Sequence, residues 1–207
     1  MDFDSLTFGP DGLIPGIVQD RSGEVRMVAW LNRDALQITL DTGFVTFWSR
    51  SRQALWTKGE SSGNRLKLVQ IRPDCDADAL LILAEPEGPS CHRGTQSCFD
   101  GEPWPTTIAW LGRLEALLKA RKSSASLEGS YTQKLFAQGV DRIAKKVVEE
   151  AGEVILAAKN DNREDFLGEA ADLLFHLDML LLERGASLLE VVEVLHQRHA
   201  DRTGGPA

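Results

Sequence analysis

The residues of this chain best suited to chemistry begin with its three cysteines, Cys75, Cys91 and Cys98. Cys91 and Cys98 stand in polar sequence where a core residue is not expected, and the carboxylates around Cys75 disfavour a thiolate unless a cation compensates. Zinc binds thiolates directly, and three protein ligands leave a fourth position for a water that ionises near neutral pH. Three buried hydrophobic cysteines are the alternative. A purely structural zinc would need His92 as a fourth ligand; His92 is otherwise a general acid or base, or neither.

The acidic run Asp74-Cys75-Asp76-Ala77-Asp78 surrounds the first cysteine. Alternate side chains of an extended strand point the same way, so the three aspartates would face one side and Cys75 the other. Like charges on one face repel one another unless a hard cation lies among them, and Mg²⁺ prefers such oxygen ligands. The pattern therefore predicts a magnesium site at Asp74, Asp76 and Asp78. A solvated acidic edge or a turn is the alternative.

A second group of acids lies in the C-terminal half, at Glu150 and Glu153 and again at Glu169 and Asp172. A spacing of i, i+3 places each pair on one face of a helix. Because apolar residues flank both pairs, we expect these carboxylates near the interior of a bundle, where like charges are costly without cations. Two such helices would form a magnesium site suited to a polyphosphate, whereas a solvated face is the alternative for either pair. His176 either touches this site or is an ordinary hydrogen-bonded histidine of the bundle.

The segments Trp48–Arg52 and Trp56–Asn64 carry a third kind of chemistry. Arginine, lysine, hydroxyl and glycine N–H groups hold phosphate, and tryptophan offers a face to a purine. Many surface loops share this composition, so a plain hairpin loop is the alternative.

Short strands are expected to position the groups of the N-terminal half. Strand-like runs separated by turn signals occupy residues 14–20, 25–31, 44–48, 66–71 and 79–83. One helix is expected from the cap residue Asn32 or Asp34 to about Leu40, ended by Gly43. The first half is therefore predicted to be an α+β domain with a mostly antiparallel sheet.

Helices are expected to position the acids of the C-terminal half. The two prolines between Asp100 and Thr107 break all periodicity, so we place a linker at residues 104–107, between domains at 1–103 and 108–207. Beyond it, apolar spacing predicts helices over residues 108–122, 140–160, about 162–184 and 188–200. The second half is therefore predicted to be an all-α helical bundle.

The bulk composition restricts the partners of the chain. It has 207 residues, 43% of them hydrophobic and 26% charged, as in an ordinary globular protein. The net charge of -8 repels nucleic acid, and a small anionic substrate would need metal cations to screen it. No run approaches the roughly 20 apolar residues that cross a bilayer, and the acidic start is unlike a signal peptide. The odd number of cysteines makes a disulfide framework unexpected, so a cytoplasmic location is expected.

Together, the N-terminal motifs resemble the phosphoribosyl-AMP cyclohydrolases of histidine biosynthesis. The resemblance rests on residues 12–15 with 19–20, both tryptophan-led segments, and residues 74–78, 90–92 and 97–99. It implies zinc on the three cysteines, magnesium on the three aspartates, and a homodimer whose subunits share each zinc site. Zinc-activated water would open the adenine ring at N1–C6, with His92 as a catalytic candidate. The candidate substrate-binding residues in this half are Arg50, Trp56, Lys58, Gly59, Glu60, Ser61 and Ser62.

Residues 108–203 resemble the phosphoribosyl-ATP pyrophosphohydrolases, relatives of the all-α nucleotide pyrophosphohydrolases, through the two acid pairs and the run Gly129–Phe136. The resemblance implies a bundle of that type and Mg²⁺-assisted attack of water between the α- and β-phosphates. Glu150 is the candidate base within the implied set of metal ligands: Glu149, Glu150, Glu153, Glu169 and Asp172. Lys134, Lys145 and Lys146 are candidates for binding phosphate, with solvated lysines as the alternative.

The two implied activities are consecutive, because the product of the pyrophosphohydrolase is the substrate of the cyclohydrolase. The sequence is thus interpreted as a bifunctional hydrolase of histidine biosynthesis that acts on phosphoribosyl-adenine nucleotides. Two rivals stand beside it. One is a housecleaning nucleotide pyrophosphohydrolase whose zinc-binding half serves dimerisation or sensing, and the other is a zinc-bearing binding protein without turnover.

Overall fold

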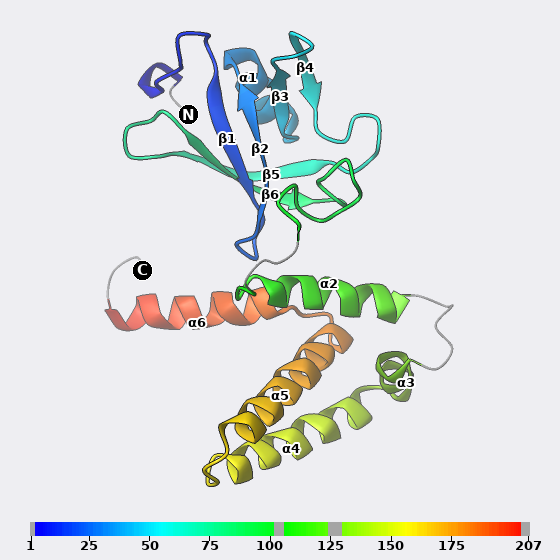
Figure 1. Ribbon diagram of the computed structural model, residues 1–207. Coiled ribbons are helices and arrows are strands. Elements are labelled where there is room, and N and C mark those ends of the chain that lie inside the picture. The colour runs from blue at the N-terminus through cyan, green and yellow to red at the C-terminus, as the bar shows by residue number, and fades with distance from the viewer. Residues whose placement is uncertain (1–2, 102–105, 124–129, 204–207) are drawn as a thin grey trace. The chain divides into compact units, whose positions relative to one another are not determined.

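The computed structural model describes residues 3–101, 106–123 and 130–203, which fall into two compact units (Figure 1). The first unit is Met1–Trp110 and the second is Leu111–Ala207. Residues 104–105 of the expected linker and Gly129 of the motif before the acid pairs lie outside the described residues.

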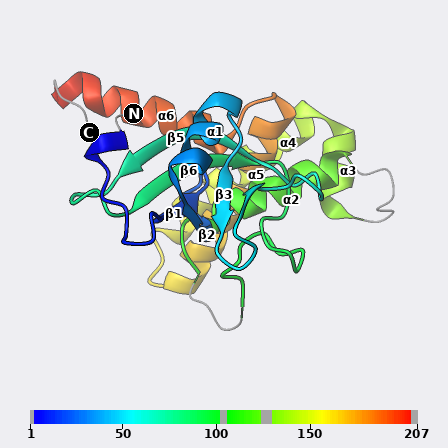
Figure 2. The same ribbon diagram turned by 90° about the horizontal axis from the view of Figure 1, so that it is seen from above.

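The first unit is built on one six-stranded sheet in the order β4-β3-β2-β1-β6-β5. Its strands are β1 (Ile14–Gln19), β2 (Val25–Leu31), β3 (Thr46–Ser49), β4 (Ala54–Thr57), β5 (Leu66–Pro73) and β6 (Leu80–Pro86). Only β1 and β6 pair in parallel; all other neighbours are antiparallel. The expected α+β domain with a mostly antiparallel sheet is confirmed. Figure 2 shows β5 and β6 lying side by side as its terminal pair.

The helix α1 (Arg33–Thr42) packs against the core of this sheet. The Asn32 side chain accepts a hydrogen bond from the Ala35 N–H at its start, and Gly43 ends it at a φ of 72°. A short 3-10 helix, Phe3–Ser5, precedes β1. The core consists of fully buried apolar side chains from β1, β2, α1, β3 and β6, among them Ile14, Leu31, Leu36, Phe47 and Ile82.

The second unit contains helices alone in its described residues, which confirms the expected all-α domain. The helices are α2 (Trp110–Ser123), α3 (Tyr131–Gln138), α4 (Val140–Ala157), α5 (Arg163–Glu183) and α6 (Leu188–Thr203). The long helices α4 and α5 lie side by side (Figure 1). The buried core joins α2, α3, α4 and α5 through Leu118, Leu135, Phe136, Ile143, Met179 and Leu182. None of the described helices is both long and apolar enough to span a membrane.

Three features differ from the sequence-based expectations. Residues 54–57 form the strand β4, paired with β3, although they are not among the expected strands. Residues 131–138 form the separate short helix α3, which Gly139, at a φ of 78°, divides from α4. The run Asp74–Asp78 is not an extended strand but the turn between β5 and β6. A turn is favoured there because the Asp74 side chain accepts backbone hydrogen bonds that a strand would have given to its neighbour.

Candidate active sites

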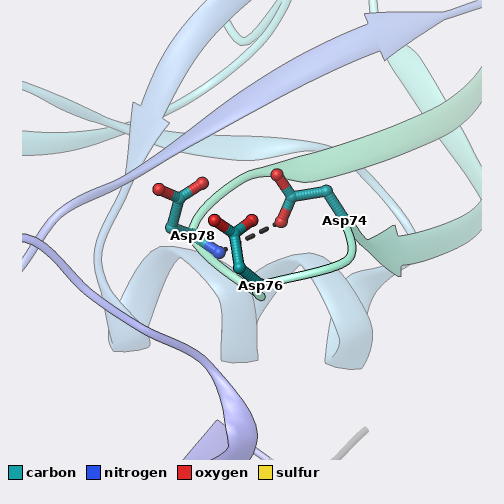
Figure 3. Close-up of side chains that lie close together, drawn as sticks. All are labelled: Asp74, Asp76 and Asp78. Carbon is teal, nitrogen blue, oxygen red and sulfur yellow. Dashed lines mark hydrogen bonds between the residues drawn. The ribbon is translucent and has the colours of Figure 1, made fainter.

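The three aspartates of the β5–β6 turn converge, although not by strand alternation (Figure 3). Asp74 Oδ1 accepts the backbone N–H of Asp78 and of Ala79, each at 3.1 Å, and Ala77 adopts a φ of 60°. Carboxylate oxygens of Asp74, Asp76 and Asp78 lie within 4.8 Å of one another, all exposed. The Asp76 and Asp74 charges raise the pKa of Asp78. Their mutual repulsion is relieved when a cation binds among them, while the exposure of the turn keeps water available to the acids.

The second cysteine-bearing segment, residues 90–98, is held against β2 by the buried side chain of Arg26. Its guanidinium donates to Ser90 Oγ at 3.3 Å and to Gln96 Oε1 at 2.6 Å, and it forms ion pairs with two acids, Asp20 and Glu24. The backbone N–H of Cys98 donates to the Arg26 carbonyl oxygen at 2.8 Å. The loop is therefore attached to Arg26 at both of its ends, Ser90 and Cys98.

Within this loop the Cys91 and Cys98 thiols are close enough for each to shift the pKa of the other. A backbone N–H from Arg93, 3.5 Å from the Cys91 sulfur, and the Thr95 hydroxyl lower the Cys91 pKa. Desolvation and the neighbouring Cys91 raise the Cys98 pKa. Two adjacent thiols with a stabilised thiolate are half of a tetrahedral zinc site.

The third expected zinc ligand does not join this pair within one chain. Cys75 is exposed in the β5–β6 turn, and no potential metal-binding group of three or more ligands in the described part of the chain includes a cysteine. His92 is exposed, and its Nδ1 lies 3.9 Å from the Cys91 sulfur. Cys91 and Cys98 alone are thus brought together.

The expected phosphate-binding segment is the β3–β4 hairpin and the turn that follows β4. Lys58 is buried except for 9% of its surface and donates to the Asn64 carbonyl oxygen at 3.1 Å. Burial lowers its pKa, whereas the nearby Cys98 and Cys91 raise it. Gly59, at a φ of 82°, has no room for a side chain, because a Cβ would come within 2.4 Å of the Asn64 backbone. The charge of this lysine therefore lies near the cysteine pair, although its hydrogen bond is to Asn64.

The remaining members of the segment are more open to solvent. The Arg50 guanidinium lies 4.6 Å from the Trp30 ring centroid, and the Arg52 guanidinium lies 5.9 Å from that of Trp56. Glu60 turns back to accept the Thr57 N–H at 3.1 Å. Ser61 and Ser62 are exposed and available to a ligand.

In the helical unit, Glu150 of α4 and the pair Glu169 and Asp172 of α5 come together. Carboxylate oxygens of these three residues lie within 4.8 Å of one another. Glu150 is 4% exposed, but Glu153 and Asp172 are exposed in the single chain, so the expected interior position is wrong for these two. The reason is that flanking apolar residues such as Leu174 are themselves 46% exposed, because α4 and α5 cover only one face of each other. The Glu150 and Glu169 charges raise the pKa of Glu153.

Lysine 146 is the cation of this cluster. Its ammonium lies 2.7 Å from Glu150 Oε1 and 2.8 Å from Glu149 Oε2, which raises the Lys146 pKa and lowers those of both glutamates. Lys134 and Lys145, the other candidates for phosphate binding, are exposed. A cavity of about 500 Å³ opens beside the cluster, lined by Tyr131, Lys146, Glu150, Asp172, Phe175 and His176.

Three of these lining residues, Tyr131, Phe175 and His176, are not among the predicted site residues. Tyr131 on α3 was quoted only within a motif, and His176 was left between a site residue and a bundle histidine. Their hydroxyl oxygen and Nε2 lie 3.0 Å apart. The position of His176 one turn after Asp172 was the sequence signal for His176, whereas nothing local pointed to Tyr131.

Comparison with known proteins gives each unit a family. Residues 27–100 match the family model of phosphoribosyl-AMP cyclohydrolase, and residues 111–199 match that of phosphoribosyl-ATP pyrophosphohydrolase. Fold and sites thus define a two-domain hydrolase with one activity in each unit.

Relatives with both domains match nearly the whole chain. The histidine biosynthesis bifunctional protein HisIE of Escherichia coli is 53% identical over 192 residues, covering 91% of this chain and 92% of its own. The HisIE protein of Bacillus subtilis is 50% identical over 203 residues, covering 96% and 97%. That of Vibrio vulnificus (strain YJ016) is 49% identical over 191 residues, covering 91% and 90%. The chain belongs to the HisIE family of bifunctional histidine biosynthesis enzymes.

Proposed function

We propose that the helical unit hydrolyses phosphoribosyl-ATP to phosphoribosyl-AMP and pyrophosphate, and that the strand-rich unit then opens the adenine ring of phosphoribosyl-AMP at N1–C6. The observation that carries this proposal is the match of two different hydrolase families to the two units of one chain. The second reaction consumes the product of the first, so their fusion delivers both enzymes in equal amounts.

In the helical unit, Glu150, Glu169 and Asp172 would hold Mg²⁺, with Glu149 and Glu153 beside them. The fit is supported by three carboxylates within 4.8 Å of one another, one of them buried, for which Lys146 supplies only a single positive charge. When bound, magnesium neutralises phosphate charge and activates water. Glu150, the most buried acid of the group, is the candidate that orients or deprotonates the attacking water, and Lys146 is placed to attract a phosphate oxygen.

In the strand-rich unit, Cys91 and Cys98 would hold zinc together with Cys75 of a second copy of the chain. The adjacent thiols and the separate, exposed Cys75 support this division. Bound zinc supplies the Lewis acidity that activates water at neutral pH. His92 beside Cys91 is the candidate for moving a proton, and reduced thiols fit the expected cytoplasm.

The phosphoribosyl arms of the substrate would be positioned by Mg²⁺ on Asp74, Asp76 and Asp78 and by the segment around Lys58. The exposed hydroxyls of Ser61 and Ser62 suit phosphate, Arg50 adds a guanidinium, and Trp56 offers an aromatic face to the purine. These assignments rest on donor chemistry and on the Lys58 charge near the cysteine pair.

A homodimer is the oligomeric state that this function requires. Apart from the separated cysteines, it is supported by apolar side chains left open on the paired helices: on α4, Val148 is 73% and Ile155 61% exposed, and on α5, Leu174 is 46% exposed. Isologous contact of two copies would cover these faces and would bring the exposed acids Glu153 and Asp172 into a drier environment.

The test is incubation of the purified full chain with phosphoribosyl-ATP, Mg²⁺ and Zn²⁺. Pyrophosphate release and the ring-opened nucleotide are followed separately, and ATP and dUTP serve as substrates without the second phosphoribosyl group. We expect both products from phosphoribosyl-ATP and little pyrophosphate from ATP or dUTP. Equal turnover of dUTP with no ring opening would establish the housecleaning rival instead.

A further inference from the structure

The hydrogen bond between Tyr131 of α3 and His176 of α5 has one direction when the imidazole ring is neutral. Nδ1 of His176 lies 2.8 Å from the backbone carbonyl oxygen of Asp172. A carbonyl oxygen only accepts, so Nδ1 must be protonated, and in the neutral ring Nε2 then carries no proton. Nε2, 3.0 Å from the Tyr131 oxygen, is then the acceptor, and the Tyr131 hydroxyl donates to it.

The His176 ring has little freedom to change this arrangement. It is 4% exposed, and Phe175 and Tyr131 pack edge-on against it, with ring centroids 5.3 Å and 6.1 Å away. Glu150 Oε1 lies 3.6 Å from Nδ1, which places a carboxylate on the same side of the ring but beyond hydrogen-bond distance. The Asp172 carbonyl oxygen keeps a proton on Nδ1, so Nε2 stays turned toward Tyr131.

The only proton of the Tyr131 hydroxyl is therefore committed to His176. The oxygen keeps lone pairs alone, on a side chain that is 54% exposed and lines the cavity beside Glu150 and Lys146. Such an oxygen attracts hydrogen-bond donors and is repelled by phosphate oxygens. In the same cavity, the Lys146 ammonium is a hydrogen-bond donor and therefore attracts phosphate oxygens.

We propose that Tyr131 contacts the substrate by accepting a hydrogen bond from a hydroxyl of the ribose that carries the triphosphate, and that His176 is the positioning residue that fixes this polarity. The inference rests on the proposed pyrophosphohydrolase function of this cavity. Of the groups near the scissile α–β bond, the phosphates offer acceptors, whereas the 2′- and 3′-hydroxyls of the adjacent ribose offer donors. The Tyr131–His176 pair thus recognises the sugar, and Lys146 recognises the phosphates.

The test compares pyrophosphate release by the full-length wild type and Tyr131→Phe, using phosphoribosyl-ATP and its 2′-deoxy and 3′-deoxy analogues at the adenosine ribose. We expect the wild type to prefer the parent substrate over one analogue by about tenfold in kcat/KM, the worth of one hydrogen bond. In Tyr131→Phe the parent should lose about tenfold, and the preference should disappear. A variant that keeps the full preference, or that is as active as the wild type, would overturn the proposal.

A second pair of variants tests the positioning role of His176. His176→Gln retains a carbonyl acceptor for the Tyr131 hydroxyl, and His176→Leu does not. We expect the leucine variant to lose the ribose preference and the glutamine variant to retain part of it. Equal losses on the parent and both analogues, in both variants, would reveal a merely structural role and refute this part.

Two controls keep the outcomes separate. Cyclohydrolase activity on phosphoribosyl-AMP and the far-UV circular dichroism of each variant report whether the chain remains folded. If the wild type releases no pyrophosphate from phosphoribosyl-ATP, the proposed function itself fails. If it does so and Tyr131→Phe is indistinguishable from it, only the present inference fails.

Discussion

The ammonium group of Lys146 lies 2.7 Å from the carboxylate of Glu150, one turn apart on α4 and both on the cavity side of the helical unit. The most buried acid of the cluster thus already has one cation beside it before any metal binds. An ion pair of this kind keeps Glu150 ionised, and its lysine can turn to a phosphate oxygen once magnesium takes over the carboxylates.

Lys146→Met should therefore lower pyrophosphohydrolase kcat/KM by roughly 10- to 100-fold, because both a phosphate contact and the partner of Glu150 are lost. The neighbouring Lys145→Met is the matched control, since Lys145 is exposed, and it should stay within about twofold of the wild type. Steady-state kinetics of pyrophosphate release measure both. Similar losses in the two variants would mean that both lysines act through their positive charge alone and that Lys146 makes no specific contact with phosphate.

The two active sites should be separable by single substitutions. Cys98→Ala should abolish ring opening of phosphoribosyl-AMP while pyrophosphate release persists, because it removes one thiol of the cysteine pair. Glu150→Ala should do the reverse, because it removes the buried acid of the other cluster. Both activities are measured for each folded variant. Loss of both in either one would contradict independent sites.

Sharing of the zinc site between subunits predicts complementation. Cys75→Ala and Cys98→Ala should each be inactive as cyclohydrolases, yet a mixed dimer contains one site with all three thiols. Co-expression in equal amounts should restore about a quarter of the wild-type activity and of its cyclohydrolase-associated zinc, because half of the dimers are mixed and each has one of two sites. A lack of recovery in demonstrably mixed dimers would place all ligands within one subunit.

The buried carboxyl of Asp178 on α5 predicts a pH-dependent stability. It is fully buried, its oxygens have no hydrogen-bond partner among the described residues, and burial, reinforced by Glu115, raises its pKa to about 7. A pKa raised in the folded state means that protonation favours folding, so its unfavourable contribution grows from about pH 4 to pH 7 and is complete above that.

Asp178→Asn should therefore raise the free energy of unfolding more at pH 8 than at pH 5, by about 2–3 kcal/mol. Urea denaturation followed by far-UV circular dichroism at the two pH values measures this difference. Asp161→Asn, in the exposed α4–α5 loop, should show no comparable change. A pH-independent effect of the Asp178 substitution would mean that this carboxyl is not neutral in the folded chain.

Local sequence determined most of the elements and the chemical character of the sites. Asn32 and Gly43 mark the ends of α1 because capping depends on a few adjacent residues, and the period of apolar residues identified the long helices. The spacing of Glu169 and Asp172 predicted a shared helix face, which follows from the helical repeat alone. The ligand assignments and the homodimer stay predictions.

Tertiary structure decided the features that depend on contacts distant in sequence. The strand β4 and helix α3 are too short for a clear period and are stabilised by their neighbours, and the Asp74 carboxylate turned an apparent strand into a tight loop. The Tyr131–His176 hydrogen bond depends on two helices that meet although the residues are 45 positions apart. Glu150 is buried and Glu153 is exposed for the same reason. Spacing fixes which face of a helix a residue occupies, whereas only packing determines what covers that face.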